Sequence, residues 1–258
     1  MNGAPVILTP AYYERLDDLE RRHWWCRSVR RVARAWLASW LRPGASILDV
    51  GCGAGGFLGE LGAARRDLRR TGVDVSPDAA RSARSRAGHV LLASASALPF
   101  QDGAFDAVLS HDVLQHLPDG DDARALAEAR RVLSPGGAVS VRTNLVRDEP
   151  EARGLHRRYS PERLASLVRA SGLEVVRHAL LHPLPALLGK LRGGRRRFAG
   201  HEIPEAHGLA LTVPPAPLNL ALDLFTRLEE PLVCALPFRV GAGDVQVLLA
   251  RPPAWRAP

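Results

Sequence analysis

The segment Ser46–Leu61, SILDVGCGAGGFLGEL, decides the fold of this chain of 258 residues. Five mostly apolar residues, Ser46–Val50, lead into a cluster of glycines, and Phe57, Leu58 and Leu61 follow at helical spacing. Glycines at such a junction let the backbone turn sharply and let a ligand approach closely, because no Cβ atoms stand in the way. The segment therefore predicts a strand, a tight ligand-binding turn and a helix.

The rest of the chain repeats this alternation of strand and helix. Strands are expected at residues 70–75, 89–93, 105–110, 138–143, 173–178 and 244–250. Helices are expected at residues 77–87, 121–133 and 161–171, and a turn is expected at Pro135–Gly137. Such alternation is typical of a mostly parallel sheet with helices on both faces, in which ligands bind beyond the carboxyl ends of the strands.

Two regions lie outside this pattern. Residues 10–41 have apolar side chains at helical spacing, so we expect a helical cap over residues 1–44 in front of a main domain over residues 45–258. Residues 180–243 interrupt the alternation with six prolines between Pro183 and Pro217, and are expected to form an insertion that serves as a lid or surface loop.

Composition limits the class of protein. With 46% hydrophobic residues the chain can bury a core, and no apolar stretch approaches the ~20 residues of a membrane span. The N-terminal residues lack the basic start of a secretory signal. Three cysteines far apart in the sequence (Cys26, Cys52 and Cys234) suggest neither a disulfide framework nor a zinc site, which indicates a cytoplasmic protein.

The net charge of +8 suggests two partners. Binding to nucleic acid is disfavoured, because most of the arginines alternate with acids as on solvated helix faces. The second partner is a membrane surface: residues 180–198 join an apolar stretch to the basic run Lys190–Arg197 and could make a weak peripheral contact with anionic lipid. The alternative for this stretch is a helical lid packed on the domain.

The acids beside the glycines indicate the kind of ligand. Asp74 ends the second strand, where a carboxylate can accept hydrogen bonds from both hydroxyls of a ribose. Gly51, Gly53 and Gly56 also satisfy the spacing of a dinucleotide site. Asp49, directly before the glycines, would repel a diphosphate and suits a cationic ligand, so S-adenosylmethionine is favoured over NAD.

These motifs resemble those of the class I S-adenosylmethionine-dependent methyltransferases, in the group of the type 11 and quinone-biosynthesis enzymes. The resemblance rests on ILDVGCGAGGFLGEL (47–61), GVDVSPDAA (72–80), ALPFQDGAFDAVLSHDVLQHLPD (97–119), ALAEARRVLSPGGAVSV (125–141), YSPERLASLVRASGLEVVR (159–177) and VQVLLARPP (245–253). The segment HWWCRSVRR (23–31) is similar to an N-terminal helix of a bacterial subset. The resemblance implies a Rossmann-like sheet of order 3-2-1-4-5-7-6 with strand 7 antiparallel.

The resemblance also implies roles for individual residues toward the cofactor. The methionine part would contact the glycine turn and the end of the fourth strand, and the ribose and adenine would contact the ends of the second and third strands. The residues concerned are Asp49, Gly51, Cys52, Gly53, Gly55, Asp74, Val75, Ser76, Ser94, Ala95, Ser110 and His111. Ser94 stands where the family usually has Asp, which should weaken binding of the adenine amino group by about 1 kcal/mol.

Catalytic and acceptor-binding residues are less defined. His111 and His116, after the fourth strand, are candidates for a general base, and Trp24, Trp25, His156 and Tyr159 are candidates for the acceptor pocket. His178 and His182 have no third acidic ligand nearby, so no metal site is expected. We expect transfer of a methyl group to an oxygen of a small molecule, such as a specialised metabolite, a sugar-containing compound or a lipid-like one. The alternatives are a nicotinamide-dependent oxidoreductase and a non-catalytic binding subunit of the same fold.

Overall fold

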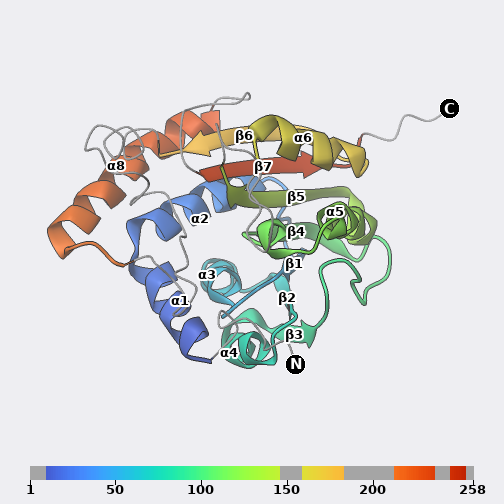
Figure 1. Ribbon diagram of the computed structural model, residues 1–258, viewed down its shortest axis with the longest axis horizontal. Coiled ribbons are helices and arrows are strands. Elements are labelled where there is room, and N and C mark those ends of the chain that lie inside the picture. The colour runs from blue at the N-terminus through green and yellow to red at the C-terminus, as the bar shows by residue number, and fades with distance from the viewer. Residues whose placement is uncertain (1–9, 146–158, 183–211, 236–244, 254–258) are drawn as a thin grey trace.

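The computed structural model describes residues 10–145, 159–182, 212–235 and 245–253 and is built around one seven-stranded sheet (Figure 1). The strands lie in the order β3-β2-β1-β4-β5-β7-β6, and β7 runs antiparallel to both of its neighbours. Their bounds are β1 Ser46–Val50, β2 Arg69–Asp74, β3 His89–Leu92, β4 Phe105–His111, β5 Leu133–Asn144, β6 Glu174–Leu181 and β7 Val245–Arg251. This confirms the order predicted from the sequence, so the carboxyl ends of β1, β2, β4 and β5 meet at one edge.

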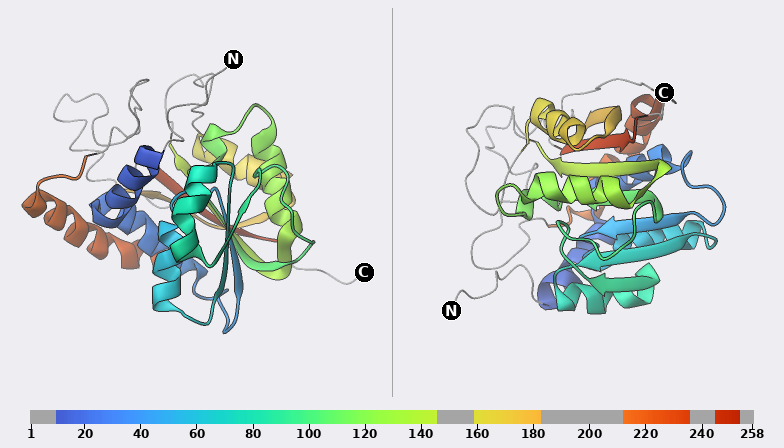
Figure 2. Two further views of the ribbon diagram at one scale, coloured as in Figure 1. Left: turned by 90° about the horizontal axis from the view of Figure 1, so that it is seen from below. Right: turned by 90° about the vertical axis from the view of Figure 1, so that its right-hand side faces the viewer.

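Helices cover both faces of the sheet (Figure 2). They are α1 Pro10–Arg22, α2 Trp24–Leu37, α3 Gly56–Ala64, α4 Pro77–Ala87, α5 Asp121–Val132, α6 Pro161–Ala170 and α8 Ala216–Ala235, with the short 3-10 helix η2 Leu114–His116. Two clusters of buried apolar side chains hold them in place, one on each face. The first joins α2, α3 and α4 to the sheet, and the second joins α5 and α6 to it.

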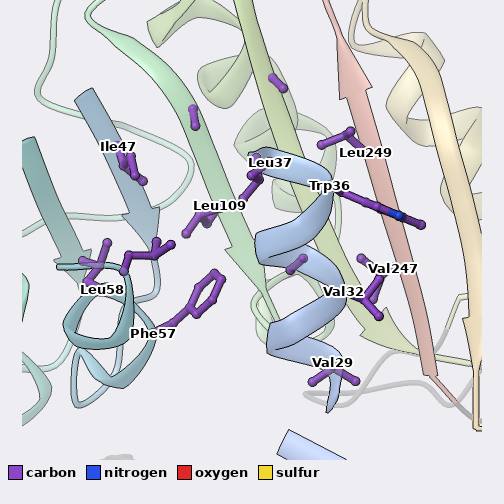
Figure 3. Packing of buried hydrophobic residues seen from close by; sticks show 14 of the residues in the cluster. Val29, Val32, Trp36, Leu37, Ile47, Phe57, Leu58, Leu109, Val247 and Leu249 are labelled. Atoms are coloured by element: carbon purple, nitrogen blue, oxygen red, sulfur yellow. The ribbon is translucent and has the colours of Figure 1, made fainter. Parts of the chain in front are cut away.

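Helix α2 occupies the centre of the first face. Val32, Trp36 and Leu37 point from it toward the strands, where they meet side chains such as Leu109 of β4 and Val247 of β7 (Figure 3). All five are at most 4% exposed. Burying an apolar side chain of this size contributes about 1.5–3 kcal/mol, so α2 is an integral part of the domain core.

The N-terminal region differs from the single helix expected over residues 10–41. The chain forms two helices, because His23 leaves the helical conformation with φ −75° and ψ 126°. Its imidazole Nδ1 accepts a hydrogen bond from the backbone N–H of Trp25 at 3.1 Å, and so caps α2. Helical spacing alone did not indicate this break.

One further expectation is corrected. The turn expected at Pro135–Gly137 lies within β5, whose pairing with β4 begins at Leu133 and is irregular between Phe105 and Ala107. A Cβ atom on Gly137 would come within 2.7 Å of the Asp106 carbonyl oxygen, so this glycine permits close approach of the two strands.

The region expected to be an insertion, residues 180–243, contributes ordered elements where the structure describes it. β6 extends to Leu181, and the 20-residue helix α8 packs beside α2. The basic run Lys190–Arg197 lies outside the described residues. Within the described ranges, no helix is both long and apolar enough to cross a lipid bilayer.

Candidate functional site

The turn after β1 has the backbone conformation that its glycines predict. Gly51, Gly53 and Gly55 have φ angles of 71°, 54° and 73°, a region that other residues adopt only with strain. A Cβ atom on Gly51 would also overlap the side chain of Val113. The N–H groups of Gly51 and Cys52 donate to the carbonyl oxygen of Val73 at 2.8 and 3.0 Å, which fixes the turn against the end of β2.

Asp74 connects this turn to the next one. Its carboxylate accepts hydrogen bonds from the backbone N–H of Gly53 at 3.0 Å and of Ser76 at 2.9 Å. Burial raises the pKa of this carboxyl, and these two hydrogen bonds oppose the rise. Ser76 caps α4 by accepting from the N–H of Ala79 at 3.3 Å, and Val75 between them is 62% exposed. A carboxylate and an exposed apolar side chain therefore lie together at the end of β2.

The residues expected to meet the adenine follow β3. The chain reaches them through a hydrogen bond from the Ala93 N–H to the Asp74 carbonyl oxygen at 3.1 Å. The Ser94 hydroxyl lies 2.9 Å from the Ser96 hydroxyl and accepts from the Ser96 N–H at 3.3 Å. Ala95 is buried in the second apolar cluster. The structure thus brings these positions next to Asp74.

Asp49 is the second acid at this edge. It is buried at the end of β1, the neighbour of β2 in the sheet. Burial is the main cause that raises its pKa to about 7; Glu20 adds to the rise, and Arg30 and Arg142 oppose it. The protonation state of Asp49 therefore changes near neutral pH, and a nearby cation would stabilise its charged form.

The cap helices lie directly over the glycine turn. Arg30 of α2 is 4% exposed and forms ion pairs with Glu20 of α1 and, at 2.7 Å, with Glu60 of α3. A Cβ atom on Gly56, the first residue of α3, would come within 2.9 Å of both the Arg30 and the Glu20 side chains. The sequence did not indicate that Arg30 is buried, because arginines beside acids are typical of solvated helix faces.

A further group of polar residues lies on the same face, at the ends of β4 and β5. His111 of β4 is the register partner of Arg142 of β5, and its ring stacks at 5.4 Å on that of Phe57 in α3. Its Nε2 lies 3.0 Å from the Ser140 hydroxyl. Burial, together with the charge of Arg142, lowers the pKa of His111 to about 3. The imidazole is therefore neutral at neutral pH and is poorly suited to accept a proton.

Arg142 is the other member of this group and was not a candidate from the sequence. Its Nε donates to Asp112 at 3.0 Å, and its guanidinium lies 5.6 Å from the centre of the Trp25 ring. Asp112 has a φ of 58°, a conformation that is uncommon for non-glycine residues. Of the three pocket candidates that the structure describes, Trp25 is the one placed against this charged group.

The other pocket candidates lie elsewhere or are not described. Trp24 is 1% exposed and packs edge-on against the ring of His182 at 5.0 Å, away from the charged group. Tyr159 is fully buried, and its hydroxyl donates to Asp122 at 3.0 Å and to the Leu114 carbonyl oxygen at 3.1 Å. These contacts hold the loop after β4 in place. His156 lies outside the described residues.

The remaining histidines have local partners. His116 ends η2, and its Nε2 lies 3.5 Å from the side-chain nitrogen of Gln115. His178 Nε2 lies 3.0 Å from the Gln246 side-chain oxygen, and His182 Nε2 lies 2.6 Å from the Ser28 hydroxyl. In the part of the chain that the structure describes, no group of three or more histidine, cysteine, aspartate or glutamate side chains could hold a metal ion.

Comparison with known proteins now identifies this arrangement. Residues 48–141 match the family model described as a methyltransferase domain. The sheet order is that of the Rossmann-like methyltransferase fold. A Haloferax volcanii methyltransferase, solved in complex with a methyltransferase activator, covers 99% of this chain and 100% of its own at 19% identity, with a TM-score of 0.62. A Haemonchus contortus phosphoethanolamine N-methyltransferase, solved with S-adenosylmethionine, covers 96% of this chain and 58% of its own at 16% identity, with a TM-score of 0.59.

Sequence relatives match this chain only in part. A protein encoded in a transposon of Streptomyces fradiae is 44% identical over 116 residues, which is 43% of this chain and 31% of that protein. A malonyl-[acyl-carrier protein] O-methyltransferase of Geobacter sulfurreducens is 39% identical over 116 residues, which is 43% of this chain and 42% of that enzyme. A probable tRNA methyltransferase 9B of Mus musculus is 33% identical over 101 residues, which is 39% of this chain and 22% of that protein. The chain thus spans less than half the length of these relatives.

The residues at the edge fit the cofactor of this family. The three glycines leave space where a Cβ atom would strain the backbone, and the two acids, Asp49 and Asp74, flank that space on adjacent strands. A ligand with a positive charge near Asp49 and hydroxyl groups near Asp74 satisfies both carboxyls.

Proposed function

We propose that the chain is an S-adenosylmethionine-dependent methyltransferase that acts on an oxygen atom of a small molecule. One observation carries the proposal: two buried carboxyls, Asp49 and Asp74, end adjacent strands on either side of a turn made of glycines in the left-handed conformation. This arrangement suits a cationic nucleoside more than a dinucleotide.

The electrostatics of Asp49 support the choice of ligand. A pKa of about 7 means that the buried carboxyl has too little positive charge around it to stay ionised easily. A diphosphate would add negative charge and raise this pKa further. A sulfonium and an ammonium group add positive charge, so binding of S-adenosylmethionine and ionisation of Asp49 favour each other.

We expect the protein to contribute to the reaction by positioning the cofactor and the acceptor. When bound, S-adenosylmethionine supplies a methyl group already activated by its sulfonium. Asp74 and the glycine turn would hold and orient the nucleoside, and the helices α1 and α2 would exclude water. Holding two reactants in line can contribute up to ~7–11 kcal/mol, so a metal or a covalent intermediate is not needed.

The acceptor group follows from His111 and Arg142. With a pKa of about 3, His111 does not take a proton from an alcohol at neutral pH. The buried guanidinium of Arg142, the register partner of His111, would stabilise an oxygen that is already anionic. We therefore propose an acceptor with an acidic oxygen, such as a carboxylate or an acidic hydroxyl. The similarity to an O-methyltransferase supports transfer to oxygen.

Two of the expected partners remain proposals. We propose a small molecule rather than a nucleic acid, because Trp25 and Arg142, which pack on each other at the acceptor side, are only 7% and 8% exposed. The similarity to a probable tRNA methyltransferase provides the alternative. A peripheral membrane contact through residues 180–198 is tested by flotation with anionic vesicles, before and after replacement of the four arginines of the basic run.

Calorimetry with S-adenosylhomocysteine and, separately, with NADH tests the proposal. We expect S-adenosylhomocysteine to bind and NADH to give no heat. Binding of NADH alone would replace the proposal by an oxidoreductase. Transfer of labelled methyl groups from S-adenosylmethionine to a panel of small acids, phenols and transfer RNA then tests catalysis. Tight binding of the cofactor without transfer to any acceptor would favour a non-catalytic subunit.

A further inference from the structure

Helix α8 exposes a ridge of leucines that nothing in the described part of the chain covers. Leu220, Leu224, Leu228 and Leu232 follow one another at intervals of four residues, which places them along one side of the helix. They are 58%, 54%, 75% and 64% exposed. We call them the α8 leucine ridge. Figures 1 and 2 show α8 at the rim of the molecule, beside α2.

The side of α8 that faces the domain buries polar residues beside the apolar Val233. Asp223 is 2% exposed and pairs with Arg31 at 2.8 Å and with Arg27 at 3.1 Å, both on α2. Arg31 also pairs with Glu230 at 3.0 Å. A surface helix normally turns its apolar side inward and its charged side outward. These ion pairs fix α8 in the reverse orientation, so the ridge cannot turn toward the core.

The size of the ridge and its arrangement indicate the occupant. Together with Leu218, which is 45% exposed, the ridge presents apolar surface on the order of 500 Å², near the upper limit for a monomer. A stable dimer needs about 800 Å² from each copy, and the alanines and prolines of the exposed side supply further area. The ridge is also symmetric about residue 226. Two antiparallel copies would place Leu224 against Leu228, and Leu220 against Leu232, twice each.

The charges of α8 disfavour a lipid surface as the occupant. The helix carries three acids and one base, and its base, Arg227, pairs with Asp223 at 3.1 Å. Helices that lie on anionic membranes are instead rich in lysine and arginine. We propose that the α8 leucine ridge is a dimer interface, occupied by α8 of a second copy of this chain. This inference goes beyond the proposed function and does not depend on it.

Sedimentation of the full chain over a range of concentrations tests the proposal. We expect a mass of twice the 28.0 kDa of one chain, with a dissociation constant on the order of 10 µM for an interface of this size. The double variant Leu224→Glu/Leu228→Glu should weaken association about 100-fold, because four carboxylates would meet at the centre of the interface. Leu92→Glu is the matched control: Leu92 is 58% exposed at the end of β3, and this variant should remain dimeric.

A second measurement does not depend on how the variants fold. The melting temperature of the unmodified chain should rise with protein concentration if it forms a dimer. A monomer at all concentrations, or a dimer that persists in the double variant, would overturn the proposal. A monomer in which the double variant lowers the melting temperature would instead assign the ridge to residues 183–211 of the same chain. A monomer that binds lipid vesicles through these leucines would assign it to a membrane. Both results contradict a dimer.

Discussion

The two ends of the candidate site are built by different means. At the end of β1 and β2, the site is held by backbone hydrogen bonds and one carboxylate. The N–H groups of the turn from Gly51 to Gly55 bond to β2, and Asp74 accepts hydrogen bonds from two backbone N–H groups. At the end of β4 and β5, side chains from distant parts of the chain meet, as Arg142 does with Asp112 and Trp25. The first end is built from residues close together in the sequence, whereas the second joins residues from distant parts of the chain.

The largest expected effect is the loss of cofactor affinity when Asp74, at the first end, is replaced. Asp74→Ala removes charge-assisted hydrogen bonds to a ribose and frees the N–H groups that it now holds, which should cost about 2–4 kcal/mol of cofactor binding. Calorimetry with S-adenosylhomocysteine should show affinity reduced about 30- to 1000-fold. Asp78→Ala, in the first turn of α4, is the control, because Asp78 pairs only with Arg81 at the surface. An unchanged dissociation constant for Asp74→Ala would mean that the nucleoside binds elsewhere.

The complementary change lies at the other end. Arg142→Met leaves Asp112 without its partner, and losing one member of a largely buried ion pair should cost about 3 kcal/mol of unfolding free energy. Urea unfolding measures this loss, and adding Asp112→Asn should restore part of it. We expect affinity for S-adenosylhomocysteine to change less than about tenfold. If Arg142→Met weakens cofactor binding as much as Asp74→Ala, the two ends are not separate.

Substitution of Gly51 tests whether the turn after β1 is rigid. Gly51→Ala would strain a backbone with a φ of 71° and overlap Val113, so we expect a loss of about 2 kcal/mol in unfolding free energy. Gly136→Ala is the matched control, since no atom lies within 4 Å of its added Cβ atom and its φ is not positive. Equal stability of the two variants in urea would show that the turn adapts freely.

The smallest expected effect is on cofactor affinity, and it comes from the ionisation of Asp49 on β1, between the two ends of the site. Asp49, with a pKa of about 7, becomes ionised between pH 6 and pH 8. Binding of the cationic S-adenosylmethionine should therefore strengthen about tenfold over this range relative to neutral S-adenosylhomocysteine. The ratio of the two dissociation constants measures this change, and Asp49→Asn should remove it. A ratio that does not vary with pH would contradict the role given to Asp49.

The same raised pKa affects stability in a defined direction. Because the pKa of Asp49 is higher in the folded protein than its ordinary value of 3.8, its protonated form favours folding. This contribution is present in acid and is lost as the pH rises from about 4 through 7. Asp49→Asn should therefore unfold at higher urea concentrations than the unmodified chain at pH 8, and at similar concentrations at pH 4.

The sequence predicted the first end and only His111 and Trp25 of the second, for a physical reason. The order of the strands, the glycine turn and the position of Asp74 follow from short segments in which hydrophobic spacing and glycine chemistry are explicit. Arg30 and Arg142 are two arginines among 34, and their burial depends on contacts with residues that lie 10 to 30 positions away, such as Glu20 and Asp112. Composition gives no signal for which arginine becomes buried.

Two local features also escaped prediction. His23 interrupts a continuous helical pattern, because its imidazole caps the helix that follows, a role seldom given to histidine. Helix α8 was not expected, because it follows a run of prolines and contains Pro231. Five of its leucines also face outward, so its apolar residues do not form the simple pattern of a helix that packs on a core.

The place of β7 in the sheet has a consequence for how the chain folds during synthesis. β7 is the last strand along the chain, yet it lies between β5 and β6, and six of its seven residues are buried. Until the ribosome releases residues 245–251, β5 and β6 each present an open strand edge, and such edges invite pairing with other chains. The sheet therefore closes only once β7 has been made, and β5 and β6 stay open to wrong pairing until then.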